Sequence, residues 1–137
     1  MPYTVLAEKL LENMIFANKS QAFSKLTKIS HGEMFALHII STHNGDITPG
    51  DISKIAGTSP ARIAAELNSL EHKGLITREI DPNNRRRILV CLTPDGIKGA
   101  KEHHKEAMQI ATDLLSQLGE KDAREYVQIM GKLGGNS

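Results

Sequence analysis

Three adjacent arginines, Arg85, Arg86 and Arg87, are the side chains of this sequence best suited to binding an anion. They lie in a polar segment, 81–87, between the β-branched run 75–80 and the apolar run 88–93. Two such runs around a polar turn predict a β-hairpin that carries the arginines at its tip. A bare arginine triplet is more often a solvated charge run, but a hairpin that follows a helix-turn-helix favours contact with DNA phosphates or a minor groove.

The alternation of side chains along a strand distinguishes the three arginines. Arg87 should point differently from Arg86, so we expect Arg85 and Arg86 to be the DNA contacts. Asp81 could serve only to form the turn, or could form an ion pair with a neighbouring arginine.

Two short helices are predicted immediately before the hairpin. Thr48-Pro49 and Ser59-Pro60 each provide a helix N-cap followed by proline at the first helical position. Gly57 separates the two helices and Gly74 ends the second. This spacing predicts a helix-turn-helix whose second helix reads the major groove.

Arg62 falls in the first turn of that reading helix, where the helix dipole disfavours a cation. Contact with a guanine edge or a phosphate would explain an arginine there, and a plain exposed arginine is the alternative. Ser59 is expected to be a helix cap first and a phosphate ligand second.

Longer amphipathic helices are predicted at both ends of the chain. Apolar residues recur at helical spacing over 3–24, 93–118 and 121–133. A further helix is expected over 30–44, beginning with a capping box made by Ser30 and Glu33. A small central unit cannot cover all of these apolar faces, and exposing them to water would be costly. A second copy of the chain is the simplest partner that could bury these apolar faces.

Composition limits the other classes of function. The 137 residues suffice for one packed domain, and the net charge of +1 excludes a generally polybasic surface. One cysteine cannot form an intrachain disulfide, and neither a signal peptide nor a long apolar run is present, so we expect a cytoplasmic protein without membrane contact. Nothing in the sequence resembles a nucleophile with its base or a phosphate loop, so we expect no enzyme and no cofactor.

The histidines and the cysteine give weak signals for a metal or redox site. His103 and His104 are adjacent and would point about 100° apart on a helix, so no metal is expected there. His31, His38 and His43 with Glu33 remain a possible scattered group, and His38 could instead line a ligand cleft. Cys91 should be half-exposed on the hairpin, where a packing thiol is the default interpretation.

The stretch 48–96 resembles the winged helix-turn-helix of MarR-type transcriptional regulators, especially in the segments 70–78, 81–86 and 92–96. The order of helices is similar over nearly the whole chain. The resemblance implies a mainly α fold with a small β-hairpin wing, in one domain over 1–137. Residues 1–30 and 95–137 would form dimerisation helices around a winged helix-turn-helix at 31–94. It also implies a homodimer that binds double-stranded DNA at a pseudo-palindromic operator, as a ligand-responsive repressor.

Carried over by position, the resemblance places Ser59, Ala61, Arg62 and Ala65 toward the groove and Arg86 at the wing tip. A small aromatic effector would lie near Phe16, Met34, Leu37 and His38. The sequence departs from the family at Asn84, where an acidic residue commonly orients the tip arginine, and the N-terminal helix lacks the cysteine of redox-sensing members. The alternative function is a winged-helix module for protein contacts.

Overall fold

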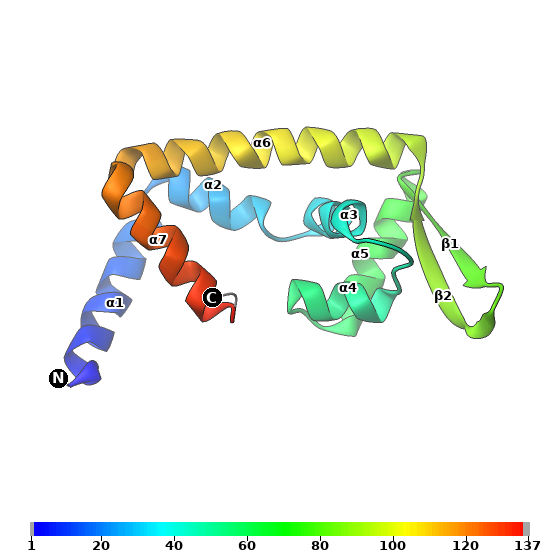
Figure 1. The fold of residues 1–137 in the computed structure, drawn as a ribbon, viewed down its shortest axis with the longest axis horizontal. Helices are drawn as coiled ribbons and strands as arrows, with labels where there is room; N and C mark the ends of the chain where they lie inside the picture. Colours follow the sequence, from blue (N-terminus) through cyan, green and yellow to red (C-terminus); the bar gives the residue numbers. More distant parts are fainter. Residues whose placement is uncertain (1, 136–137) are drawn as a thin grey trace. The chain divides into compact units, whose positions relative to one another are not determined.

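The computed structural model describes residues 2–135. Their elements, shown in Figure 1, are α1 (Tyr3–Ala17), α2 (Gln21–Ile29), α3 (Glu33–Thr42), α4 (Pro49–Ala56), α5 (Pro60–His72), β1 (Ile76–Asp81), β2 (Asn84–Leu92), α6 (Pro94–Leu118) and α7 (Glu120–Leu133). The predicted winged helix-turn-helix, mainly helical with one β-hairpin, is confirmed. Among the described residues, none of the helices combines the length and hydropathy that crossing a membrane requires.

The chain divides into two compact units. The winged-helix unit is Lys28–Glu106, and the terminal unit contains the residues up to Thr27 and from Ala107 onward. The sequence analysis placed the boundaries of the winged helix-turn-helix after residues 30 and 94. In the structure the boundaries of the winged-helix unit lie after Thr27 and after Glu106, and the second of these falls inside α6.

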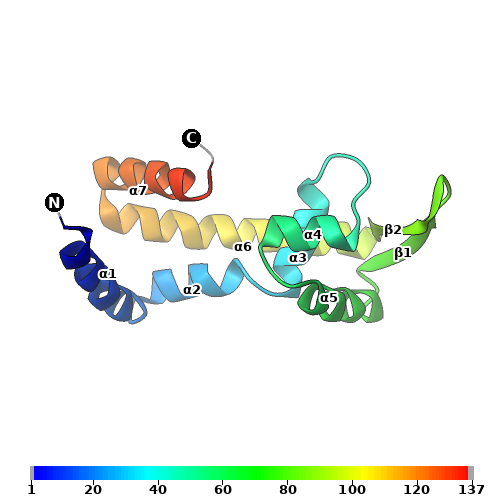
Figure 2. The same ribbon diagram turned by 90° about the horizontal axis from the view of Figure 1, so that it is seen from below.

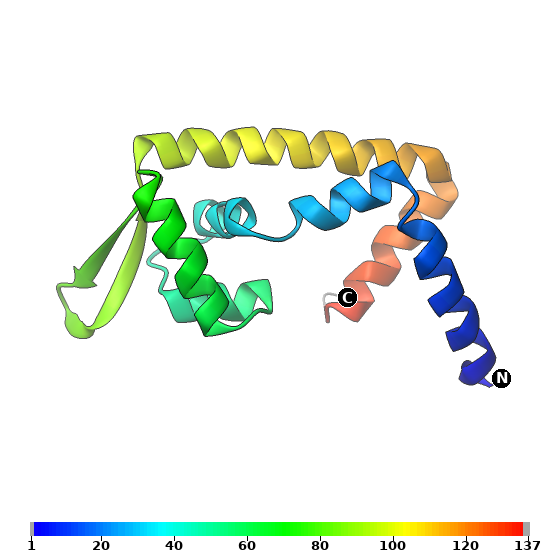
Figure 3. The same ribbon diagram turned by 180° about the vertical axis from the view of Figure 1, so that it is seen from behind.

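The prediction of one continuous helix over 3–24 was wrong. The chain turns between α1 and α2 (Figure 3). Asn18, Lys19 and Ser20 form the break, and the hydroxyl of Ser20 accepts the backbone N–H of Phe23 at 3.3 Å. Asparagine and serine bond to nearby backbone and therefore favour caps and turns, and this local preference interrupted an apolar pattern that continues through it.

The predicted capping box of Ser30 and Glu33 was also wrong. The N-cap of α3 is Gly32, whose φ of 88° lies in the region that favours glycine. Glu33 instead forms an ion pair with Lys73 at the end of α5, and this partner lowers the pKa of the Glu33 carboxyl. This ion pair joins residues 40 positions apart in the sequence.

The two predicted caps of the helix-turn-helix are confirmed. Thr48 Oγ1 accepts the N–H of Asp51 at 3.2 Å, and Asp51 Oδ2 accepts the N–H of Thr48 at 3.0 Å, which completes a capping box. Ser59 Oγ accepts the N–H of Arg62 at 3.2 Å. Gly57 makes the left-handed turn between the helices with a φ of 64°.

One hydrophobic core holds the winged-helix unit together. It joins α3, α4, α5, the hairpin and the start of α6, and its most deeply buried large side chains are Leu37, Ile52, Ile63, Leu67, Leu70 and Ile76. Fully burying such side chains stabilises by roughly 1.5–3 kcal/mol each before entropy is counted. The core therefore fixes the orientation of α5 relative to α3 and α4.

The hairpin is antiparallel and extends away from the three helices α3, α4 and α5 (Figure 1). Ile76 pairs with Leu92 at its base, and a register irregularity lies between Ile80 and Asp81. The N–H of Val90 donates to the carbonyl of Ile47 at 2.9 Å, which ties β2 to the loop before α4. Because β2 already begins at Asn84, the three arginines lie on its first residues.

Close packing joins the base of the hairpin to α6. Thr93 Oγ1 donates to the carbonyl of Gly74 at 2.6 Å and accepts the N–H of Gly96 at 3.0 Å. A Cβ at Gly96 would lie 1.9 Å from the carbonyl oxygen of Leu75, so only glycine fits there. The hydrogen bonds of Thr93 and the close approach of Gly96 to Leu75 thus join the end of α5, the base of the hairpin and the start of α6.

The helices α1 and α7 of the terminal unit expose their apolar side chains. No residue of α1 or α7 is buried, although both carry large apolar side chains. Gly119, with a φ of 81°, separates α6 from α7, which doubles back from the end of α6 (Figure 2). The more exposed apolar side chains are Tyr3, Val5, Leu10, Leu11, Met14, Ile15, Phe16, Met108, Val127, Ile129, Met130 and Leu133.

Candidate nucleic-acid interface

The six residues predicted to contact DNA are all exposed. They come from two elements of the winged-helix unit: the first two turns of α5 with its N-cap, and the start of β2. They are Ser59, Ala61, Arg62, Ala65, Arg85 and Arg86.

The outer face of α5 is short of long side chains. Ile63, Leu67 and Leu70 turn into the core, and Ala61 and Ala65 are exposed on the opposite side. The remaining long polar side chains in the first two turns belong to Arg62 and Glu66. Recognition by this helix would therefore rest on few groups.

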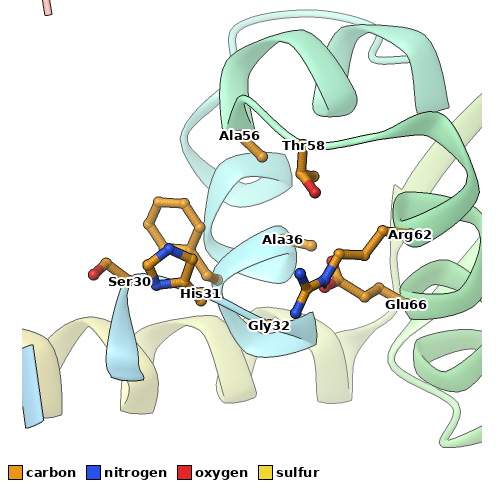
Figure 4. Close-up of a pocket in the computed structure, with 9 residues that line it drawn as sticks. Ser30, His31, Gly32, Ala36, Ala56, Thr58, Arg62 and Glu66 are labelled. Carbon is orange, nitrogen blue, oxygen red and sulfur yellow. Dashed lines mark ion pairs between the residues drawn. The ribbon is translucent and has the colours of Figure 1, made fainter. Parts of the chain in front are cut away.

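Arg62 and Glu66 form an ion pair one turn apart on α5. Arg62 Nε lies 3.8 Å from Glu66 Oε1, with the arginine side chain 66% exposed and the glutamate 16% exposed. Figure 4 shows the two side chains at the wall of a pocket lined also by Ala36 of α3, Ala56 of α4 and Thr58. The glutamate is thus held in the pocket wall, while the guanidinium remains accessible.

The wing tip is organised by Asp81, whose side chain is buried. Asp81 Oδ1 accepts the N–H of Asn83 at 2.9 Å, and Asp81 Oδ2 lies 3.3 Å from Arg87 Nη1. Both roles left open by the sequence, turn former and ion-pair partner, are present together. Arg87 is half-buried in this pair, whereas Arg85 and Arg86 are exposed. Alternation alone would place Arg85 on the same face as Arg87, so the ion pair with Asp81 is what distinguishes Arg87 from Arg85.

Asn84 occupies the position where the family resemblance implied an acidic residue. Its Oδ1 accepts the backbone N–H of Arg86 at 3.2 Å. The side chain therefore orders the backbone of the tip while leaving the charge of Arg86 uncompensated by a carboxylate at this position.

Arg78 joins the wing to α5. Its Nη2 donates to Asn68 Oδ1 at 2.7 Å and to Glu71 Oε1 at 2.9 Å, and its Nε reaches Glu71 Oε2 at 3.4 Å. The hydrogen bonds from Arg78 lower the pKa of the Glu71 carboxyl. A planar guanidinium held by two residues of one helix fixes the direction in which β1 leaves that helix.

The histidines meet in an arrangement that the sequence did not predict. His38 of α3 stacks on His104 at 5.6 Å between ring centroids, and His103 lies 5.8 Å from His38. His103 is buried, and its Nε2 lies 3.1 Å from the carbonyl oxygen of Ile29. Burial lowers the pKa of His38, and the charges of His103 and His104 lower it further.

The described residues contain no group of three or more histidine, cysteine, aspartate or glutamate side chains arranged to hold a metal ion. The Nδ1 atoms of His38 and His103 are buried, and neither has a hydrogen-bond partner among the residues that the structure describes. Cys91 is half-exposed on β2, and burial raises the pKa of its thiol, which disfavours the reactive thiolate.

The residues predicted to surround an effector are distributed over both units. Met34, Leu37 and His38 lie on α3, where Leu37 is fully buried in the core and the other two are half-buried. Phe16 lies on α1 in the terminal unit, 64% exposed, with Lys19 Nζ 5.4 Å from its ring centroid.

Glu66, Asn68 and the anchoring role of Arg78 are features of the candidate interface that the sequence analysis missed: Glu66 pairs with Arg62, and Asn68 binds Arg78 of the wing. The spacing of Arg62 and Glu66, four positions apart on a predicted helix, was a readable signal. Nothing in the sequence indicated that Arg78 would reach Asn68, because that contact depends on the angle between the wing and α5.

Comparison with known proteins agrees with this architecture. The sequence profile of the MarR family matches residues 29–88. An uncharacterized HTH-type transcriptional regulator of Bacillus subtilis, YwhA, is 30% identical over 99 residues, which cover 72% of this chain and 70% of the relative.

Two solved structures share the fold. The MepR–DNA complex of Staphylococcus aureus matches with a TM-score of 0.69 at 23% identity, over 100% of this chain and 99% of the other. BpsR of Bordetella bronchiseptica, described as regulated in DNA binding by 6-hydroxynicotinic acid, matches with a TM-score of 0.70 at 20% identity, over 85% and 94% of the two chains.

Proposed function

The chain belongs to the MarR family of transcriptional regulators, and we propose that it represses transcription by binding a pseudo-palindromic DNA operator as a homodimer. The observation that carries this proposal is the exposure of Arg85 and Arg86 on a wing anchored to a capped helix-turn-helix. DNA binding by the structural relative MepR supports it.

In the proposed complex, α5 lies in the major groove. The helix N-terminus with Ser59 faces a phosphate, since exposed N–H groups and the helix dipole both favour an anion there. Arg62 contacts a base edge, and small Ala61 and Ala65 allow the helix to approach the bases closely. Arg85 and Arg86 reach the phosphates or the minor groove beside the site.

The proposed dimer rests on the exposed apolar side chains of α1 and α7. These helices carry large apolar residues and bury none of them. At about 25 cal/mol per Å² of apolar surface removed from water, covering two such faces provides a large driving force for association. Two copies related by a twofold axis would present two α5 helices to two half-sites, which is why a pseudo-palindrome is proposed.

We also propose that a small aromatic acid is the effector. The half-buried Met34 and His38 on α3 are the candidate contacts in the winged-helix unit, and Phe16 and Leu37 remain candidates from the family resemblance alone. The regulation of the structural relative BpsR by an aromatic acid supports this class of ligand. A thermal-shift screen of such acids, followed by DNA titration with each hit, tests the proposal, and an unchanged melting temperature and DNA affinity across the panel would contradict it.

A comparison of DNA with an acidic protein surface tests the proposed function itself. Fluorescence anisotropy would follow the binding of a labelled mixed-sequence duplex and of a labelled polyglutamate of equal charge, over a series of salt concentrations. We expect tighter binding to the duplex, with a logarithmic salt dependence that reflects counterion release from phosphates. Equal binding to both polyanions would instead favour a winged-helix module for protein contacts.

A further inference from the structure

The pairing of Arg62 with Glu66 is not explained by the stability of α5. Arg62 lies in the first helical turn, where the positive end of the helix dipole disfavours it. With the arginine on the N-terminal side of the glutamate, the pair also has the less favourable order for an i,i+4 ion pair. An ion pair at 3.8 Å with one exposed partner contributes little to stability, so its effect should be sought in what Arg62 binds.

Burial makes Glu66 the fixed partner. Its side chain is only 16% exposed and lines the pocket between α3, α4 and α5, beside Ala36 and Thr58 (Figure 4). Arg62 is 66% exposed, with its Nε facing the carboxylate. At 3.8 Å the contact is an ion pair and not a hydrogen bond, so the N–H groups of the 66% exposed arginine remain available to an acceptor outside the protein.

A carboxylate beside an arginine alters its choice among acceptors. An unpaired arginine binds any phosphate and releases counterions, which strengthens binding to every sequence. A phosphate that approaches the pair meets the negative charge of Glu66 as well, whereas the neutral N7 and O6 atoms of guanine do not experience this repulsion between charges. When DNA covers the pair, the lower local dielectric strengthens this discrimination.

We propose that Glu66 is a specificity-determining positioning residue, which holds and partly neutralises Arg62 so that the guanidinium reads a base edge and contributes little to nonspecific binding. This inference rests on the proposed DNA-binding function. Glu66 acts through Arg62 and makes no DNA contact of its own.

The test is the isosteric substitution Glu66→Gln, which keeps the size of the side chain and removes its charge. The operator would first be identified by selecting bound sequences from a random duplex pool. Binding to this operator and to a scrambled duplex would then be measured over a salt series, and circular dichroism would establish that each variant is folded. We expect affinity for the scrambled duplex to rise severalfold, with a salt slope steeper by about one unit per protomer. Operator affinity should rise less, so that the ratio of operator affinity to scrambled-duplex affinity falls by roughly twofold or more.

Three further variants isolate the pair. Glu79→Gln, on the exposed part of β1, removes the same charge from the winged-helix unit without touching Arg62 and should leave the affinity ratio unchanged. Glu66→Asp keeps the charge and should retain a ratio closer to that of the wild type. In an Arg62→Ala background, Glu66→Gln should no longer change the ratio, which a general charge effect would still do.

The outcomes distinguish failure of the inference from failure of the proposed function. If the wild type prefers its operator and Glu66→Gln raises both affinities by one common factor, the inference is overturned while the proposed function stands. The inference is likewise overturned if the effect of Glu66→Gln on the ratio persists without Arg62. A wild type that binds both duplexes equally contradicts the proposed function and the inference together.

Discussion

Arg87 Nη1 lies 3.3 Å from Oδ2 of Asp81, a residue only 5% exposed at the turn of the wing. The same carboxylate accepts the N–H of Asn83, so it fixes the turn and holds one of the three arginines in a half-buried ion pair. Asp81 thereby determines which arginines the wing presents: Arg85 and Arg86.

Substitution of Asp81 should therefore affect stability and DNA binding in different ways. Asp81→Ala removes both interactions and should cost about 1–3 kcal/mol in urea unfolding, because a part-buried hydrogen bond to the Asn83 N–H and an ion pair to a half-buried guanidinium are lost. Asp81→Asn keeps an oxygen for the Asn83 N–H and should cost less. With Arg87 released, both variants should show a steeper salt dependence of DNA binding, and a slope equal to that of the wild type would contradict this role of Asp81.

Arg86 and Arg62 should behave differently when each is replaced by alanine. Arg86→Ala should weaken binding to all duplexes nearly alike and make the salt slope shallower by about one unit per protomer, since it removes a phosphate or minor-groove contact. Arg62→Ala should cost about 1–3 kcal/mol per half-site and relax the preference at one base position. Isotherms on operator and scrambled duplex check both, and the reverse pattern would show that the roles are exchanged.

The histidine cluster predicts loss of stability in mild acid. Because the pKa of His38 is lowered in the folded state, the unfolded chain binds a proton first as the pH falls below about 6.5. Stability should therefore be highest above pH 6.5 and fall between that value and the lower folded pKa. Urea midpoints at pH 7.5 and 5.5 measure the difference, and His38→Gln should reduce it.

The control for this pH dependence is His72→Gln, at an exposed position at the end of α5. It should leave the difference between the two urea midpoints as it is in the wild type. A His38→Gln protein with an unchanged difference would assign the acid sensitivity to other groups.

The terminal helices predict a dimer in solution. Sedimentation at micromolar concentration should give about 30 kDa, twice the chain mass of 15.0 kDa. Leu10→Asp places a charge on the exposed apolar face of α1 and should dissociate or unfold the protein, whereas Lys9→Asp on the same helix should not. A well-folded wild-type monomer at that concentration would contradict the dimer.

Local signals in the sequence predicted the parts of the fold that local interactions form. The hydroxyl groups of Thr48 and Ser59 cap their helices by accepting the backbone N–H of the residue three positions later. Because this contact is local, the sequence predicted it without knowledge of the tertiary structure. The hairpin likewise followed from alternation and turn residues. The break after Ala17 was missed because the apolar pattern continues beyond it.

Contacts between distant segments could not be read in the same way. Glu33 pairs with Lys73 although a local partner, Ser30, was available in the sequence, because packing brings α3 and α5 together. The anchoring of Arg78 to Asn68 depends on the angle at which the wing leaves α5. These contacts orient the proposed DNA-binding surface, while the sequence identified only the residues exposed on it.

Selection of bound sequences from a random duplex pool tests sequence-specific binding by a twofold dimer most directly. We expect enrichment of an inverted repeat whose half-sites are centred about one helical turn apart, because two α5 helices related by a twofold axis would read them. Enrichment should weaken at one base position of each half-site with Arg62→Ala and persist with Arg86→Ala at lower affinity. Recovery of no common sequence by a folded protein would contradict the proposed function.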